Sequence, residues 1–373
     1  MAIKPSYIIT VFSSLLILFI GHKIALSEPF LFQNVTHEIL RARVQEVVAR
    51  TGPEEVFEGF MPTLSERIIF EAAVTRGERR GEIVTAAQSL SGWVTPREVA
   101  RGNVILLINV NDVWHFNGFV RTNRLLGLGL LFVLCVLFFG GKKGFNTILS
   151  LGLTFGAIFA VFIPSIFSGI NIYLTAILVC VYVIATTLLL VIGFNKKALV
   201  AAIGCASGVA VSGIITVIMD RVLFLTGLVD DQSRFLLNLP VGYPINLRAI
   251  IFAGIIIGAM GAIMDVAMSI SSSLWEVKEK ARMISFKTLY RSGLNIGRDI
   301  MGSMANTLIL AYTGSSLSVV LILSVFSNSL MTLFNSEMII VEILKALVGS
   351  FGILAAMPLT AFFCGLFFTK KGK

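Results

Sequence analysis

The stretch Gly258-Ala-Met-Gly-Ala-Ile-Met-Asp-Val-Ala-Met-Ser-Ile-Ser-Ser-Ser-Leu274 carries one carboxylate, Asp265, inside an otherwise apolar run. A second run, Gly297-Arg-Asp-Ile-Met-Gly-Ser-Met-Ala-Asn-Thr-Leu-Ile-Leu-Ala-Tyr-Thr-Gly-Ser-Ser316, is also apolar and carries acid, amide and hydroxyl groups. A charge at membrane depth costs roughly 3 kcal/mol on insertion scales, so such groups usually have a function there. The two stretches therefore indicate a polar pathway or binding site within a bilayer.

The composition of the whole chain is typical of a polytopic membrane protein. Its 373 residues are 56% hydrophobic and 14% charged, whereas soluble proteins are about 25% charged. The net charge of +9 comes largely from lysines and arginines at the ends of apolar runs, where they set orientation in the membrane, so we expect no nucleic acid as a partner. The four cysteines lie in apolar segments, away from the polar region, which predicts no disulfide framework there. We expect no cofactor, and the identity of any metal stays open.

Eight apolar segments approach or exceed the roughly 20 residues that a spanning helix needs. They are Tyr7–Ala25, Leu125–Gly141, Thr147–Phe167, Ile172–Gly193, Ala198–Val222, Ala249–Leu274, Ile300–Phe326 and Met338–Phe368. The lysine-rich segments alternate along the chain and all fall on one side if both termini are cytoplasmic. The fold class predicted is an α-helical polytopic membrane protein with about eight transmembrane helices.

The first apolar segment has two interpretations that stay open. Ala25-Leu-Ser27 resembles a signal-peptide cleavage site. The apolar run is longer than a usual signal core, which favours an uncleaved membrane anchor over residues 1–26.

Residues 27–122 are polar enough to form a separate extracytoplasmic domain between the first two spans. Short segments with alternating polarity, typical of half-buried strands, occur at 39–47, 67–75, 82–85, 103–109 and 113–120. Five short strands in so few residues predict a small β-rich, OB-like barrel. The remaining residues, 123–373, are predicted to form a seven-helix transmembrane domain. Within it, the charged segment Glu276–Asn295 is expected to be a cytoplasmic elbow linking two spans, with a lipid-sensing or gating helix as the alternative.

Four segments of the second half resemble the YibE/F family of bacterial multi-pass membrane proteins. They are Met264-Asp-Val-Ala-Met-Ser-Ile-Ser-Ser-Ser273, Asn295-Ile-Gly-Arg-Asp-Ile-Met-Gly302, Asn306-Thr-Leu-Ile-Leu-Ala-Tyr312 and the segment 349–360 with Pro358. The chain departs from the family pattern at Lys280-Ala-Arg282 and at Arg101-Gly-Asn103, outside the intramembrane motif. The resemblance implies a bacterial inner-membrane protein with an outer β-rich domain, and it implies little about function.

Polar residues recur at helical spacing in both intramembrane stretches. Residues three or four apart share a helix face, which aligns Asp265 with the serines that follow it and with glycines that would admit a neighbouring helix. Asp265 is therefore expected to face a protein interior, and Asp299 to stand at the cytoplasmic start of the next span. Both spans are expected to be interrupted, one at its terminal serines and one at Tyr312–Ser316. The predicted pathway residues are Asp265, Ser269, Ser272, Asp299, Asn306, Thr307, Thr313 and Ser315, and the predicted packing glycines are Gly254, Gly258, Gly261, Gly302 and Gly314.

Three functional hypotheses stay open. The favoured one is a small-solute or ion transporter, linked to protons or to a hard cation such as Na⁺, Mg²⁺ or Mn²⁺, which oxygen ligands suit. The second is a membrane scaffold in which Asp265 pairs with Arg298 or Lys278 and the outer domain recognises an envelope partner. The third is an intramembrane enzyme using Asp265 and Asp299 as a dyad, and the lack of a recognisable catalytic motif favours a non-enzyme. The expected partners are the lipid bilayer and a cation or small solute, and homo-oligomerisation stays open.

Overall fold

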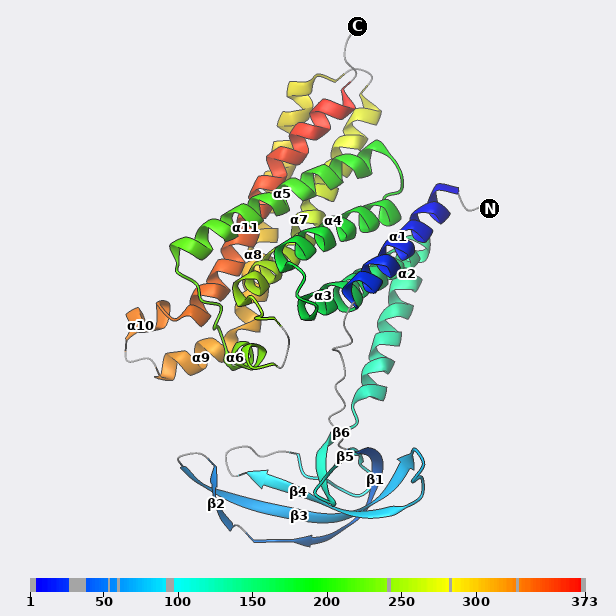
Figure 1. Ribbon diagram of the computed structural model, residues 1–373. Coiled ribbons are helices and arrows are strands. Elements are labelled where there is room, and N and C mark those ends of the chain that lie inside the picture. The colour runs from blue at the N-terminus through cyan, green and yellow to red at the C-terminus, as the bar shows by residue number, and fades with distance from the viewer. Residues whose placement is uncertain are drawn as a thin grey trace. The chain divides into compact units, whose positions relative to one another are not determined.

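The computed structural model describes residues 5–26, 38–52, 54–58, 61–91, 97–239, 243–281, 284–326 and 329–369. The chain divides into two compact units, one formed by Met1–Leu31 with Val136–Lys373 and the other by Phe32–Cys135. All the strands belong to the second unit and nearly all the helices to the first (Figure 1). The two units are described separately.

The β unit contains the five predicted strands and one more. The strands are β1 (Ile39–Arg50), β2 (Glu54–Glu58), β3 (Met61–Arg76), β4 (Ile83–Ser91), β5 (Val104–Val110) and β6 (Val113–Phe119). Strand β2, which the sequence pattern did not reveal, pairs with β3.

The strand pairing of the β unit is cyclic. The order is β1-β5-β6-β4-β3-β2. An additional pairing between β1 and β3 closes this order into a ring. All pairs are antiparallel except β4 with β6. Fully buried side chains that include Ile68, Phe70 and Leu107 fill the space that the strands surround. Asn111 and Asp112 connect β5 to β6 with φ of 52° and 63°, as a two-residue hairpin turn of type I′ requires.

The membrane unit consists of helices of very different lengths. They are α1 (Pro5–Ala25), α2 (Thr122–Gly156, which begins in the β unit), the π-helix η1 (Ala157–Phe162), α3 (Ile163–Phe167), α4 (Ile172–Val191), α5 (Lys196–Val222), α6 (Asp231–Leu237), α7 (Leu247–Lys280), α8 (Phe286–Ser315), α9 (Leu317–Phe326), α10 (Leu330–Phe334) and α11 (Glu337–Phe368). Within the described residues, six helical stretches are long and apolar enough to cross a membrane. The chain is therefore a mainly helical membrane protein.

Two local features explain why the described residues contain six candidate membrane spans, whereas the sequence predicted eight. The predicted second and third spans form one helical stretch, Thr122–Phe167, which Gly141 interrupts with φ of 51° and ψ of −126°. The predicted seventh span, Ile300–Phe326, is not among the six. It corresponds to the second half of α8 followed by α9.

The connection between α7 and α8 is shorter than the sequence suggested. Glu276–Asn295 was expected to be an elbow, but α7 continues to Lys280 and α8 already begins at Phe286. The predicted interruption near Tyr312–Ser316 is confirmed, because α8 ends at Ser315 and α9 begins at Leu317. The interruption predicted at the serines of α7 is wrong, because that helix is continuous from Leu247 to Lys280.

Small residues hold α5, α7 and α11 in close contact (Figure 1). A Cβ atom built at Gly204 would lie 2.0 Å from the hydroxyl oxygen of Thr360. One built at Gly208 would lie 2.7 Å from Ile263 and 2.9 Å from Ala356. The pattern at positions 204, 208 and 212 is the small-xxx-small spacing of close helix pairs in membranes.

Helix α1 is fastened along its length to the rest of its unit. The Tyr7 hydroxyl donates to Asn146 Oδ1 at 2.9 Å, and the Tyr182 hydroxyl donates to the backbone oxygen of Ser14 at 3.1 Å. At the other end, the Ser168 hydroxyl donates to the backbone oxygen of Ala25 at 2.6 Å. These bonds make α1 an integral part of the membrane unit.

Candidate functional site

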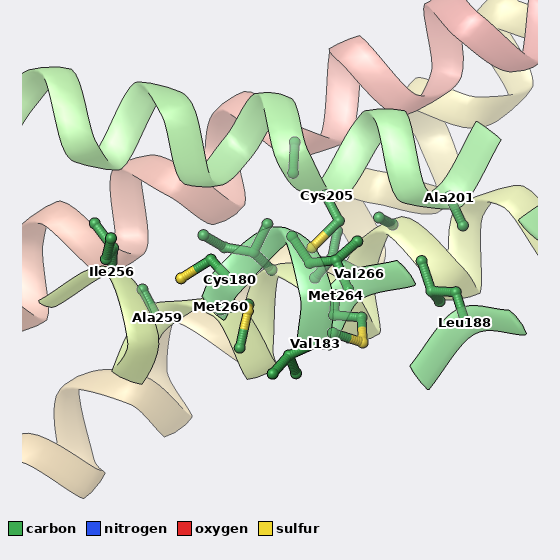
Figure 2. Close-up of a cluster of buried hydrophobic side chains, with 14 of the residues drawn as sticks. Cys180, Val183, Leu188, Ala201, Cys205, Ile256, Ala259, Met260, Met264 and Val266 are labelled. Carbon is green, nitrogen blue, oxygen red and sulfur yellow. The ribbon is translucent and has the colours of Figure 1, made fainter. Parts of the chain in front are cut away.

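Asp265 lies on a face of α7 that the described helices leave largely open. Helix α7 packs against α4, α5, α8 and α11, and its covered face carries the fully buried Ile263, Val266 and Ile270. Figure 2 shows that the interior beside α7 is filled by apolar side chains, among them Met260 and Met264. The Asp265 side chain is exposed. The expectation that it faces the interior is therefore wrong for the single chain.

A stripe of small and polar residues continues along this face of α7, which α8 approaches at Gly258. Gly254, Gly258 and Gly261 precede Asp265 and are exposed, while Ser269 and Ser272 follow it and are half-buried. We call these residues, with Asp265, the α7 stripe. Its period of three to four residues is the helical spacing that the sequence predicted.

Helix α8 runs beside the apolar length of α11. Gly293 packs against Ala361, Gly297 against Met357, and Leu308 against Gly349. The middle of α8 therefore lies at the depth of the middle of α11, which is one of the apolar candidate spans. Asp299 was expected at the cytoplasmic start of its span. The residue lies near the centre of α8, which begins more than three turns earlier, at Phe286, and the start of the span relative to the membrane stays a prediction.

The exposed side of α8 has no apolar side chain over most of its length. From Lys287 to Thr307 every exposed residue is charged, polar or glycine. We call this set the α8 polar face, and it consists of Lys287, Thr288, Arg291, Asn295, Arg298, Asp299, Gly302, Ser303, Asn306 and Thr307. Twenty residue steps of an α-helix cover about 30 Å, which matches the hydrocarbon thickness of a bilayer.

Helix α4 exposes the opposite kind of surface. The exposed residues of α4 are Leu174, Ile177, Leu178 and Val181, all of them apolar. Such a face is suited to lipid, whereas a lipid-facing Arg298 or Asp299 would cost about 3 kcal/mol each at the bilayer centre. Within a bilayer, the α8 polar face would therefore require water or protein next to it.

The principal polar groups of the two open faces lack partners in the part of the chain that the structure describes. Among the described residues, no hydrogen bond or ion pair reaches the side chains of Asp265, Asp299 or Asn306. The hydroxyl groups of Thr307 and Ser315 instead donate to backbone oxygens of their own helix, at Ser303 and Tyr312, both at 2.8 Å.

The ion pair expected in the scaffold hypothesis does not form between the described residues. Neither Lys278 nor Arg298 lies within ion-pair distance of Asp265, and the Lys278 ammonium stands 4.4 Å from the centre of the Trp275 ring. No hydrogen bond joins the carboxyl groups of Asp265 and Asp299. In the described part of the chain, no three histidine, cysteine or acidic side chains gather as metal ligands would.

The predicted packing glycines differ in their surroundings. A Cβ atom at Gly258 would lie 2.4 Å from the Tyr312 hydroxyl, so this glycine admits α8 against α7. At Gly254, Gly261, Gly302 and Gly314 a Cβ atom would meet no heavy atom within 4 Å. These four glycines face open space in the single chain.

A polar cluster at the end of α8 was not assigned by the sequence. The Ser316 hydroxyl donates to Glu342 Oε2 at 2.6 Å, and Lys345 Nζ lies 2.5 Å from the other carboxylate oxygen. Tyr312 and Thr313 line a pocket of about 320 Å³ beside this cluster. The three-residue spacing of Glu342 and Lys345 was the available signal.

A second unassigned polar group lies at the ends of α4, α5 and α7. Asp220 lies 3.8 Å from Arg248. Both line a pocket of about 390 Å³ together with Tyr173, Thr216 and Arg221. An acidic residue at the end of an apolar run was the signal for this site, although the sequence gave no indication that Arg248 would be its partner.

The comparisons with known proteins identify a family. The model of the family described as YibE/F-like protein matches residues 128–370 of the chain, a range that includes α7 and α8. No curated protein and no solved structure matches the chain.

Proposed function

The chain belongs to the YibE/F-like family, and from this premise we propose that it transports a small solute or an ion across the membrane. The path runs along the α8 polar face and the α7 stripe. Transport is linked to protons or to a hard cation, because the groups on this path offer oxygen atoms and neither thiols nor imidazoles.

The observation that carries this proposal is the unpaired carboxylate of Asp265. It lies in the middle of an apolar helix, on an open face, without a cation from the described residues to neutralise it. A residue that only locks helices together would point into the packed interior, where α7 instead carries isoleucine, valine and alanine. A carboxylate on an open face is free to bind and release a proton or a cation.

The same proposal includes the topology. The six candidate stretches become eight crossings in two steps. The break at Gly141 divides the stretch Thr122–Phe167 into two crossings, and α8 with α9 adds one more. Both termini are then cytoplasmic and residues 27–122 lie on the outer side of a bacterial inner membrane, as the lysine distribution favours. The hydrogen bonds that fasten α1 to α2, α3 and α4 support an uncleaved anchor.

A second candidate function is a scaffold that recognises an envelope partner through the β unit. The cyclic pairing of β1, β3, β4, β6 and β5 supports an OB-type barrel. Barrels of this type bind many kinds of ligand, so the fold alone does not identify a partner.

The experiment is a flux measurement in proteoliposomes. The purified protein is reconstituted with a trapped pH-sensitive dye, and inward gradients of H⁺, Na⁺, Mg²⁺ or Mn²⁺ are imposed one at a time. We expect one of these gradients to change the dye signal, and we expect Asp265→Asn to reduce that flux about tenfold or more, equivalent to ~1.4 kcal/mol of barrier.

The matched control is Asp112→Asn, which makes the same chemical change at an exposed turn of the β unit, where asparagine tolerates the positive φ. It should leave the flux unchanged. Normal folding and undiminished flux in Asp265→Asn would rule out Asp265 as part of the path.

A further inference from the structure

The α8 polar face is too polar for lipid and is left uncovered by the described parts of its own chain. Helix α8 contacts α7 and α11 along its length and α9 at its end. Its remaining side carries the neighbouring charged residues Arg298 and Asp299 and the amide of Asn306. A face of this kind in a membrane is covered by protein or borders a water-filled space enclosed by protein.

We propose that the part of the α8 polar face around Arg298, Gly302 and Asn306 docks against the same part of a second copy of this chain. The two chains then enclose the path beside this contact, along the α7 stripe. This inference rests on the proposed function for what passes along the path. The contact between copies is argued from the residues of the face itself.

The face is complementary to itself under a two-fold axis along the membrane normal. Such an axis keeps both copies in the same orientation and brings each residue opposite its own counterpart at the same depth. Arg298 of one copy then meets Asp299 of the other, only one helical step away along the axis. Asn306 meets Asn306, and an amide both donates and accepts hydrogen bonds.

Glycines on the same side permit the two copies to approach closely. Gly302 lies within the α8 polar face between Asp299 and Asn306, and a Cβ atom there would touch nothing within 4 Å. Gly261, one turn from Asp265 on the α7 stripe, is equally open. Glycines at a helix contact allow backbones to pack at short distance in membranes. Asp265 then lies beside the contact, where it borders the enclosed path.

The first test is disulfide formation in native membranes. In a Cys135→Ser background, which removes the one exposed cysteine among the four, Gly302→Cys is compared with Val181→Cys on the apolar face of α4. A disulfide requires Cα atoms within about 4.4–6.8 Å of each other. We expect mild oxidation to convert Gly302→Cys mainly to a covalent dimer and to leave Val181→Cys monomeric. Equal cross-linking of the two variants, or none at position 302, would overturn the proposal.

The second test uses charge and does not depend on a cysteine. Arg298→Asp and Asp299→Arg are produced with different affinity tags, alone and together. Each variant alone places like charges opposite one another and should associate poorly with itself, whereas the mixed pair restores opposite charges and should co-purify. Co-purification that is the same for all pairings would contradict the proposed contact.

The outcomes separate this inference from the transport proposal. Cross-linked dimers with undiminished flux in Asp265→Asn would retain the contact and reject Asp265 as part of the path. Loss of flux in Asp265→Asn without a cross-link at position 302 would retain the path and reject the second copy.

Discussion

Helices α4 and α8 belong to the same membrane unit and expose opposite kinds of residue. Helix α4 exposes only leucine, isoleucine and valine, and its polar residues Thr175 and Thr186 are turned inward and bonded to their own helix. Helix α8 buries leucine and glycine and exposes charge, amide and hydroxyl groups. We infer that the two helices have different surroundings, with lipid next to α4 and water or protein next to α8.

The largest effect on membrane integration should come from placing a charge on the apolar exposed face of α4. Leu178→Asp places a carboxylate on the exposed side of α4 and should cost about 3–4 kcal/mol of insertion free energy. Ser303→Asp makes a similar change on the α8 polar face and should cost far less, because that face does not contact lipid. The membrane-integrated fraction after carbonate extraction measures both. A similar loss of integration in the two variants would remove the distinction between the faces.

A smaller difference, in stability, is expected between leucine substitutions at covered glycines and at open glycines. Gly208→Leu forces a side chain into Ile263 and Ala356 and should lower stability by about 3 kcal/mol, the upper part of the usual range for overpacking. Gly254→Leu makes the same change where nothing lies within 4 Å and should leave the unfolding temperature of the detergent-solubilised protein nearly unchanged. Equal unfolding temperatures for the two variants would show that the open and covered faces are wrongly assigned.

Much of the architecture could be predicted because it depends on local pattern. Alternating polarity located five of the six strands, and long apolar runs located α1, α4, α5, α7 and α11. The exception among the helices was α8. Its charged first half resembled a cytoplasmic loop, although its buried positions 289, 293, 297 and 308 keep the spacing of one continuous helix.

The candidate site was harder to predict because it depends on which face of a helix finds a neighbour. Glycines at helical spacing occur on both α5 and α7. Those at 204 and 208 on α5 are in close contact, whereas those at 254 and 261 on α7 are open. The local sequence does not distinguish the glycines that contact another helix from those that face open space. Tertiary packing makes that distinction, and here it turns Asp265 outward from its own chain.

The most direct test of the central claim is to measure what surrounds α8 in a lipid bilayer. A nitroxide spin label is attached at Gly302→Cys and, separately, at Val181→Cys, both in the Cys135→Ser background, and its collision rates with oxygen and with a water-soluble nickel chelate are recorded. Oxygen concentrates in lipid, so we predict frequent oxygen collisions for the label on α4 and infrequent ones for the label on α8. Oxygen collisions as frequent on α8 as on α4 would contradict the account, because the α8 polar face would then lie in lipid.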